Sequence, residues 1–221
     1  MRPGPLIRRL FGPHERRVAE AYRRIFVDLD ELAGLMSAWV PRAQRILEVG
    51  CGEGAMTERI ARAYPTAAVT AIDISPRVGR LFRGQTFAVT FRQETIADLV
   101  CREPASFDLV VLSDVIHHVP ADARRSLIGA IDQAIAPNGS LFFKDWVVSA
   151  SPIHWLCALS DRYLTGDDVA YCTLGGLSAL VTDVFGPGTI RRMDTVRPWH
   201  NNVAVLLQRS DQPFSRDTAN R

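Results

Sequence analysis

Three glycines follow a short apolar run near the start of the chain. Residues 46–54 read Ile-Leu-Glu-Val-Gly-Cys-Gly-Glu-Gly, which places glycine at positions 50, 52 and 54. Glycine lets the backbone turn tightly and leaves no Cβ in the path of a ligand. A helix that begins after this turn would add free N–H groups and a positive dipole end. The segment predicts a ligand-binding turn, with an acidic residue, Glu48, two positions before its first glycine.

A second acidic residue closes the next apolar run. Asp73 follows Ala71 and Ile72, at a distance from the glycine turn that leaves room for one helix. A carboxylate at such a strand end can accept both hydroxyl protons of a ribose. Alone, Asp73 would be explained as a helix cap, but together with the glycine turn it predicts a ribose site. The spacing GxGxG differs from the GxGxxG of dinucleotide-binding folds, which argues against NAD.

The elements that must position these residues alternate in type after Pro41. Apolar, β-branched runs predict strands, and the segments between them predict helices; nearly continuous apolar strands indicate a parallel sheet buried on both faces. The predicted strands are 45–50, 68–73, 87–92, 107–113, 140–146, 189–194 and 203–208. The predicted helices are 55–63, 77–82, 95–101, 121–136 and 174–185.

Two segments fall outside this alternation. Between residues 13 and 40 the apolar residues recur every three or four positions, which predicts a helical layer, with Asp28 and Asp30 as candidate caps of a second helix. Residues 151–172 are too long for a simple connection, and they are predicted to form a helical insertion that is either a substrate wall or lid, or a cover for the sheet edge. We therefore expect a helical extension over 1–40 and a main domain over 41–221.

Composition bounds the remaining possibilities. Hydrophobic residues make up 47% of the chain and the net charge is +2, as in an ordinary soluble protein without a nucleic-acid partner. We expect no transmembrane segment, because no apolar stretch reaches about 18 residues, and no secretory signal, because the N-terminus lacks an apolar region. The four cysteines lack CxxC spacing, which suggests neither a zinc site nor a disulfide frame and predicts a reducing cytoplasm. Lys144 is the only lysine among 26 basic residues. Residues 1–24 contain seven arginines. They could attract a phosphate or an acidic substrate, or simply form a solvated helix face. Whether this helix is a lid, a homodimer contact or a membrane-surface element stays open at this point.

The order of these motifs resembles the class I S-adenosylmethionine-dependent methyltransferases over roughly residues 40–208. Residues 93–95, 107–119 and 136–145 are similar to the later motifs of that family, although Asn138-Gly139 stands where many relatives have two glycines. Asparagine also tolerates left-handed backbone, so this departure matters little. The resemblance implies a Rossmann-like seven-stranded, mostly parallel sheet with helices on both faces, an N-terminal helical layer and a helical insertion after strand five.

The resemblance also implies which residues bind S-adenosyl-L-methionine. Glu48 would hold the amino end of this donor, and the glycines would line its methionyl and ribose groups. Asp73 would bind the ribose, and Glu94 and Thr95 would flank the adenine. Ser113 and Asp114 would lie beneath the sulfonium. The full expected set is Glu48, Gly50, Cys51, Gly52, Gly54, Asp73, Ile74, Glu94, Thr95, Ser113 and Asp114.

Methyl transfer to a hydroxyl requires a base, and two candidates follow predicted strands: the pair His117-His118 and Asp145. Adjacent histidines point in different directions, so we expect at most one to face the acceptor; each candidate could instead bind a loop or cap a helix. No defensible set of metal ligands is present, so no metal is expected. Trp146, Trp155 and Trp199 could form an aromatic pocket or pack in the core.

The leading hypothesis is therefore methyl transfer to oxygen, nitrogen or carbon of a small molecule, of the kind found in bacterial quinone or secondary metabolism. Methylation of RNA or another macromolecule is the alternative, but the fourth strand lacks the Asn/Asp-Pro-Pro-Tyr/Phe cluster of base amino methylation. A non-catalytic donor-binding subunit and a NAD-linked dehydrogenase are two further alternatives. The intact glycine turn argues against the former, and its spacing against the latter.

Overall fold

A seven-stranded sheet forms the centre of the computed structural model, which describes residues 14–84, 88–160 and 169–208. Its strand order is β3-β2-β1-β4-β5-β7-β6; β1 to β5 run parallel, and β7 pairs antiparallel with β5 and β6. The strands are β1 (Arg45–Val49), β2 (Ala68–Asp73), β3 (Val89–Gln93), β4 (Phe107–Ser113), β5 (Ile135–Trp146), β6 (Ile190–Val196) and β7 (Asn202–Gln208). This confirms the predicted seven-stranded, mostly parallel sheet, in which β6 and β7 form an antiparallel pair.

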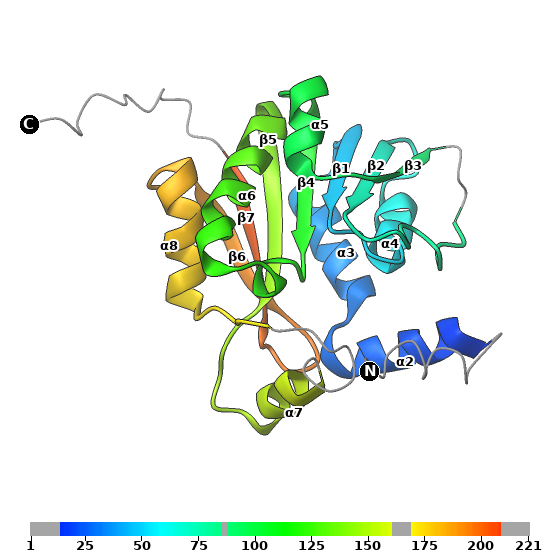
Figure 1. Cartoon of the computed structure of the whole chain (residues 1–221), viewed down its shortest axis with the longest axis vertical. Helices are drawn as coiled ribbons and strands as arrows, with labels where there is room; N and C mark the ends of the chain where they lie inside the picture. Colours follow the sequence, from blue (N-terminus) through cyan, green and yellow to red (C-terminus); the bar gives the residue numbers. More distant parts are fainter. Residues whose placement is uncertain (1–13, 85–87, 161–168, 209–221) are drawn as a thin grey trace, which may run out of the picture.

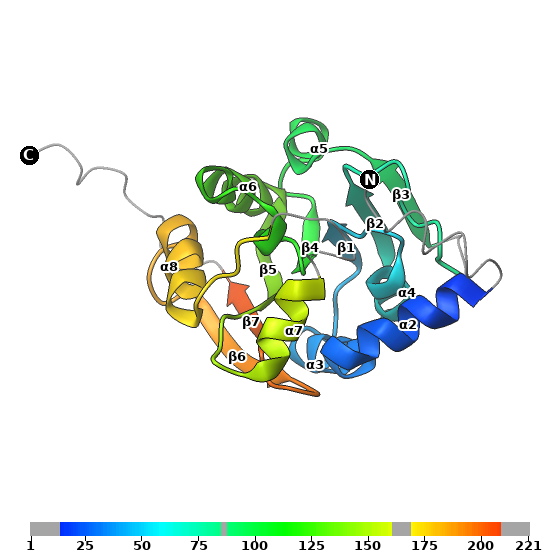
Figure 2. The ribbon, with the colours of Figure 1, turned by 60° about the horizontal axis from the view of Figure 1, so that its bottom comes forward.

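Helices cover both faces of the sheet (Figure 2). On one face Leu32 and Ile60 pack in the same apolar cluster as strand residues, and on the other Ile131 and Val181 do so. Because both faces are covered, inner strands such as β4 and β7 are apolar almost throughout, whereas the edge strand β6 is mostly exposed and polar. The helices are α3 (Leu29–Trp39) and α4 (Ala55–Ala63) on the first face, and α5 (Ile96–Arg102), α6 (Ala121–Ala134) and α8 (Leu174–Phe185) on the second.

The N-terminal layer consists of two helices, α2 (Glu15–Phe26) and α3. Asp28 caps α3, because its side chain accepts hydrogen bonds from the N–H groups of Asp30 and Glu31. Asp30 lies in the first turn instead of capping. Helix α2 runs along the end of the sheet where the parallel strands finish (Figure 1), whereas α3 packs against one face of the sheet. The insertion contributes α7 (Pro152–Ser160) at this same end, and residues 161–168 lie outside the described part of the chain.

The predicted helix over 77–82 is wrong, because this segment forms turns. Gly79 has φ of +64°, and its N–H donates to the carbonyl of Gly52. The N–H of Leu81 donates to the carbonyl of Glu53 in the same way. Two backbone N–H groups of the segment therefore bond to the glycine turn, while those of Arg80 and Phe82 close short turns within the segment. A smaller difference lies at β5, which begins at Ile135 because that residue pairs with Phe107 across a bulge.

Candidate active site

The glycine turn lies between β1 and α4, next to the point where the strand order reverses. Its three glycines all have positive φ, from +51° at Gly52 to +91° at Gly54. The N–H groups of Gly50 and Cys51 both donate to the carbonyl of Ile72, which ties the turn to β2. A Cβ added at Gly52 would meet no atom within 4 Å, so the backbone there faces open space. Ligands of open α/β sheets bind in the crevice at such a reversal.

Asp73 lies at the end of β2 and supports the glycine turn from below. Its Oδ2 accepts the N–H of Gly52 at 2.7 Å, and its Oδ1 accepts the N–H of Ser75 at 2.7 Å. A carboxylate offers about four lone-pair positions, so about two remain for the hydroxyls of a ribose. The neighbouring Ile74 is 76% exposed, which leaves an apolar side chain uncovered beside the crevice.

Glu48 and Cys51 are buried beneath the turn. Burial, together with the negative charge of Asp73, raises the pKa of Glu48 to about 7, although Thr57 acts to lower it. One carboxyl oxygen of Glu48, Oε2, has no hydrogen-bond partner within the described residues. Burial also raises the pKa of the Cys51 thiol, with Glu48 and Asp73 adding to the effect. Cys51 therefore stays a neutral thiol and is not a nucleophile.

Glu94 and Thr95 follow β3 and are engaged with protein groups. Glu94 forms an ion pair with Arg102, and its N–H donates to the carbonyl of Asp73. The Thr95 hydroxyl accepts the N–H of Asp98 at 3.1 Å and so caps α5. Both residues lie beside β2 at the carboxyl edge of the sheet, as expected, but their side chains already have structural partners.

At the end of β4, Asp114 forms a short contact with Lys144 of β5. Lys144 Nζ lies 2.5 Å from Asp114 Oδ1, and the Ser113 hydroxyl donates to Asp114 Oδ2 at 3.3 Å. Burial acts to raise the pKa of Asp114, but the positive charges of Lys144 and His117 hold it below its ordinary value. Asp114 has φ of +58°, a left-handed backbone that aspartate adopts more readily than most residues. The pair fixes a carboxylate next to the glycine turn.

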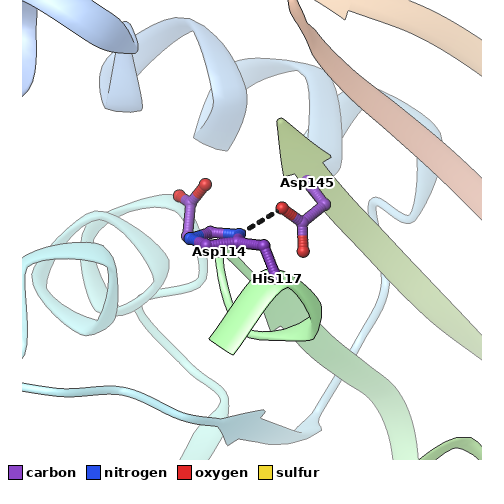
Figure 3. Close-up of side chains that lie close together, drawn as sticks. All are labelled: Asp114, His117 and Asp145. Carbon is purple, nitrogen blue, oxygen red and sulfur yellow. Dashed lines mark hydrogen bonds and ion pairs between the residues drawn. The ribbon is translucent and has the colours of Figure 1, made fainter. Parts of the chain in front are cut away.

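His117 lies in a short 3-10 helix, η2 (Ile116–His118), and faces Asp145 at the end of β5. His117 Nδ1 lies 2.5 Å from Asp145 Oδ1, and both side chains are buried (Figure 3). Burial acts to lower the pKa of His117, but the hydrogen bond and charge of Asp145, with Asp114, raise it above its ordinary value. Asp145 Oδ1 also accepts the N–H of Trp146 at 2.7 Å, which fixes the carboxylate. This is the arrangement of a base held by an acid.

The second histidine of the pair, His118, is exposed, and its ring centroid lies 4.2 Å from that of His117. Both residues border one cavity of about 220 Å³, and the expectation that at most one of them faces the acceptor stays a prediction. Trp146 also borders this cavity, while Trp155 and Trp199 are exposed elsewhere. The lining residues are Tyr22, Arg23, Phe26, Val27, Leu29, Asp114, His117, His118, Lys144, Trp146, Cys157, Tyr171 and Asn202.

Sequence reasoning missed Lys144, Arg23 and Tyr171. Lys144 stands alone in an apolar strand and is the only lysine of the chain, a signal that could have found it. Arg23 lines the cavity from α2; burial lowers its pKa, and the acidic residues around it, Glu20 first, oppose that effect. An arginine on an amphipathic helix carries no comparable signal, since most such residues face water.

Asp114, His117 and Asp145 also resemble a metal-ligand set, since one ligand atom from each lies within 4.8 Å of the others. Lys144, however, already supplies a positive charge at Asp114, and His117 is hydrogen-bonded to Asp145. A divalent cation would have to displace both contacts. The expectation of a metal-free reaction therefore stays a prediction with a physical argument behind it.

Known proteins share both sequence and fold with this chain. Residues 46–139 match the family model described as a methyltransferase domain. The ubiquinone biosynthesis O-methyltransferase of Xanthomonas campestris is 35% identical over 102 residues, which cover 44% of this chain and 41% of that protein. The enzyme of the same name from Azotobacter vinelandii is 33% identical over 143 residues, 61% of this chain and 59% of that protein. The chain thus aligns with about half the length of these curated relatives.

Solved structures match over more of the chain at lower identity. The 1,6-didemethyltoxoflavin-N1-methyltransferase of Burkholderia thailandensis superposes with a TM-score of 0.65 at 16% identity, covering 94% of this chain and 88% of that one. The pyocyanin biosynthetic protein PhzM superposes with a TM-score of 0.64 at 20% identity, covering 90% and 59%. At these identities the likeness concerns the fold. The chain thus has a fold shared with S-adenosylmethionine-dependent methyltransferases, and residues 46–139 within it match the model of a methyltransferase domain.

Proposed function

We propose that this chain transfers a methyl group from S-adenosyl-L-methionine to an oxygen or nitrogen of a small aromatic acceptor. The observation that carries the proposal is the His117–Asp145 pair at the wall of a cavity lined by aromatic side chains. Tyr22, Phe26, Trp146 and Tyr171 suit a planar ring, and the cavity volume suits one ring system better than a polymer. The names of the relatives include both O- and N-methyltransferases, so both acceptor atoms stay in the proposal.

The donor would occupy the crevice above the glycine turn. The open space at Gly52, the free lone pairs of Asp73 and the exposed Ile74 fit a ribose and an adenine. Beside them Gly50, Cys51, Gly54, Glu48, Glu94 and Thr95 would complete the wall, with Ser113 and Asp114 at the reacting end. Arg23 would bind the carboxylate of the donor, because it lines the cavity and its positive charge is close enough to interact with Glu53 of the glycine turn and with Asp114. When bound, the donor supplies a methyl group on a positively charged sulfur that leaves as a neutral thioether.

His117 would act as the base that removes the proton from the acceptor. Its Nδ1 is committed to Asp145, so Nε2 is the atom that accepts the proton. The carboxylate of Asp145 holds the ring in this orientation and stabilises the imidazolium that forms. Asp145 is therefore proposed as the partner of the base, and His118, which borders the same cavity, as a contact of the acceptor.

Lys144 and Asp114 would set the charge at the reacting end. Lys144 keeps the Asp114 carboxylate ionised and fixed, with one oxygen bound to the ammonium and the other to the Ser113 hydroxyl. A fixed negative charge next to a positively charged sulfur favours donor binding. The rest of the cavity is largely apolar, which excludes water from the acceptor.

We further propose a cytoplasmic enzyme with a small-molecule partner instead of a nucleic acid. A net charge of +2 supports this, because binding to phosphate backbones depends on strong positive charge. None of the described helices is both long and apolar enough to cross a bilayer. A homodimer stays a prediction.

Calorimetric titration with S-adenosylmethionine and S-adenosylhomocysteine tests the donor site. Micromolar binding of both is expected, with Asp73→Ala weakening it at least tenfold, since that variant loses the ribose contact and the support of Gly52. Transfer of a labelled methyl group to a panel of phenols, quinols and heteroaromatic amines then identifies the acceptor. A folded protein that binds neither compound, or wild-type affinity in Asp73→Ala, would overturn the assignment of the donor site.

A further inference from the structure

The chain returns from the insertion through three residues, Ala170 to Cys172, that pass directly beside His117. The N–H of Ala170 donates to the His117 carbonyl at 2.8 Å. On the other side, Cys172 forms a bridge with Val147 after β5, and its carbonyl accepts the N–H of Val148 at 2.9 Å. Tyr171 lies between these two anchor points.

The Tyr171 ring stacks on the imidazole of His117. Their centroids are 5.2 Å apart and their planes differ by 24°. The Tyr171 hydroxyl contacts Cys157 of α7 at 3.5 Å, and His154 packs edge-on against the same ring at 5.2 Å. His154 Nδ1 in turn accepts the indole N–H of Trp146 at 2.9 Å. Tyr171 therefore connects the ring of the proposed base to the insertion helix.

Arg124 of α6 holds both residues that flank Tyr171. Its Nη2 donates to the carbonyl of Ala170 at 2.5 Å, and its Nη1 donates to the sulfur of Cys172 at 2.9 Å. Its Nε donates to the Val119 carbonyl, just after η2, at 2.9 Å. Burial raises the pKa of Cys172 even though the Arg124 charge opposes it, so the sulfur accepts as a neutral thiol. Arg124 is buried, and a guanidinium holds its donors in one rigid plane.

We propose that Arg124 is a positioning residue for the base: it fixes residues 170–172 and thereby holds the Tyr171 ring against the imidazole of His117. The inference rests on the proposed function in so far as His117 is the base. The guanidinium joins the segment after η2 to the segment after the insertion, so one side chain sets the distance between the histidine and the ring that covers it. The carbonyl of His117 is bound to the same segment, which makes the arrangement a closed loop of contacts.

Matched variants separate this role from simple support of the fold. Arg124→Gln removes the rigid set of donors, whereas Arg124→Lys keeps the charge. The neighbouring Arg125→Gln is the control, because Arg125 is on the same helix but is 65% exposed and pairs only with Asp183 among the described residues. Tyr171→Leu removes the stacked ring without touching Arg124, and Tyr171→Phe keeps the ring but loses the hydroxyl.

The expected result is a fall in kcat of about 10- to 100-fold in Arg124→Gln and Tyr171→Leu, the size of effect seen when a reacting group is misplaced by about 1 Å. Tyr171→Phe should keep most of the rate and Arg124→Lys part of it, with KM for the donor unchanged in all four. The pH midpoint of kcat should move down in the two damaging variants, because a displaced imidazole loses the hydrogen bond that His117 donates to Asp145, and this bond raises the pKa of His117. A purely structural role would lower the melting temperature but leave this midpoint in place.

A titration of the histidine side chains by nuclear magnetic resonance gives a readout that does not need turnover. The His117 signal is assigned by its loss in His117→Gln, and its midpoint is compared among wild type, Arg124→Gln, Tyr171→Leu and Arg125→Gln. A downward shift in the first two variants and none in the control supports the proposal, and an unchanged midpoint in Tyr171→Leu overturns it. If the wild type binds no S-adenosylhomocysteine, the proposed function fails while this titration still decides the positioning role.

Discussion

Replacing Asp145 by asparagine tests the proposed base most directly, because the change keeps the shape of the side chain and removes its charge. The variant can still accept the Trp146 N–H, so the end of β5 keeps its geometry. What changes is the 2.5 Å contact with His117 Nδ1, which turns from a charge-assisted hydrogen bond into a neutral one. Hydrogen bonds to charged groups contribute about 1.5–3 kcal/mol and neutral ones about 0.5–1.5 kcal/mol, a difference of about 1–1.5 kcal/mol.

This difference converts into about one pH unit for the imidazole, at 1.36 kcal/mol per unit. The neutral form of His117 is the one that accepts a proton, so activity rises with pH through the pKa of His117. In Asp145→Asn this midpoint should lie about one unit lower, and the rate above it should fall about tenfold because the imidazolium is less stabilised. The assay is the pH profile of kcat/KM between pH 5 and 9, with Asp183→Asn, an exposed aspartate on α8, as the control.

The contact between His117 and Asp145 also makes the stability of the fold depend on pH. The folded-state pKa of His117 is raised, so the pair stabilises the fold below the ordinary imidazole pKa of about 6.5, and this contribution is lost as pH rises through the higher folded value. Asp145→Asn should therefore lower the melting temperature more at pH 5.5 than at pH 9. Equal losses at both values, or an unmoved pH midpoint of kcat/KM, would refute the reasoning.

Three further outcomes are expected. Gly50→Ala should destabilise the fold by about 1–3 kcal/mol in urea unfolding, because φ is +75° and the new Cβ would lie 2.4 Å from Val115 Cγ2; stability equal to wild type would contradict the geometry of the turn. Lys144→Met should lower the free energy of unfolding by about 2 kcal/mol. This is less than for a fully buried pair, because the Asp114 side chain is 39% exposed. The same variant should bind the donor more weakly in calorimetry. Dialysis against EDTA should leave turnover unchanged, and a loss restored by Mg²⁺ would assign a metal to Asp114, His117 and Asp145.

The parts of the site that the sequence predicted are those set by local backbone. The glycine turn and Asp73 sit at two consecutive strand ends, and parallel strands bring their carboxyl ends to one edge whatever the rest of the fold does. The same rule explains why His117, after β4, and Asp145, near the end of β5, lie close together, although the sequence named them only as alternative bases. Their direct bond depends on the register that pairs Ser113 with Lys144, which no local pattern specifies.

The parts that could not be predicted depend on contacts between distant segments. Arg124 and Ala170 are 46 positions apart, and their bond requires the insertion to return beneath η2. Residues 77–82 have a helical pattern, but the N–H groups of Gly79 and Leu81 donate to the glycine turn instead of to a helix. Lys144 was overlooked because a lysine in an apolar strand ordinarily marks an edge that faces water, whereas here the charge of Asp114 accommodates it inside.

Because Lys144 is buried, cleavage of the chain at this residue can report how often the sheet opens. It is the only lysine in the chain and is 1% exposed, in a strand paired on both sides. A lysine-specific protease therefore has one cleavage position, and it lies in the middle of the sheet. Cutting requires β5 to leave its neighbours, so the rate of cleavage measures how often the sheet opens. A donor or acceptor that binds only the closed sheet should slow this cleavage in proportion to its occupancy, which gives a binding assay without a label or a known product.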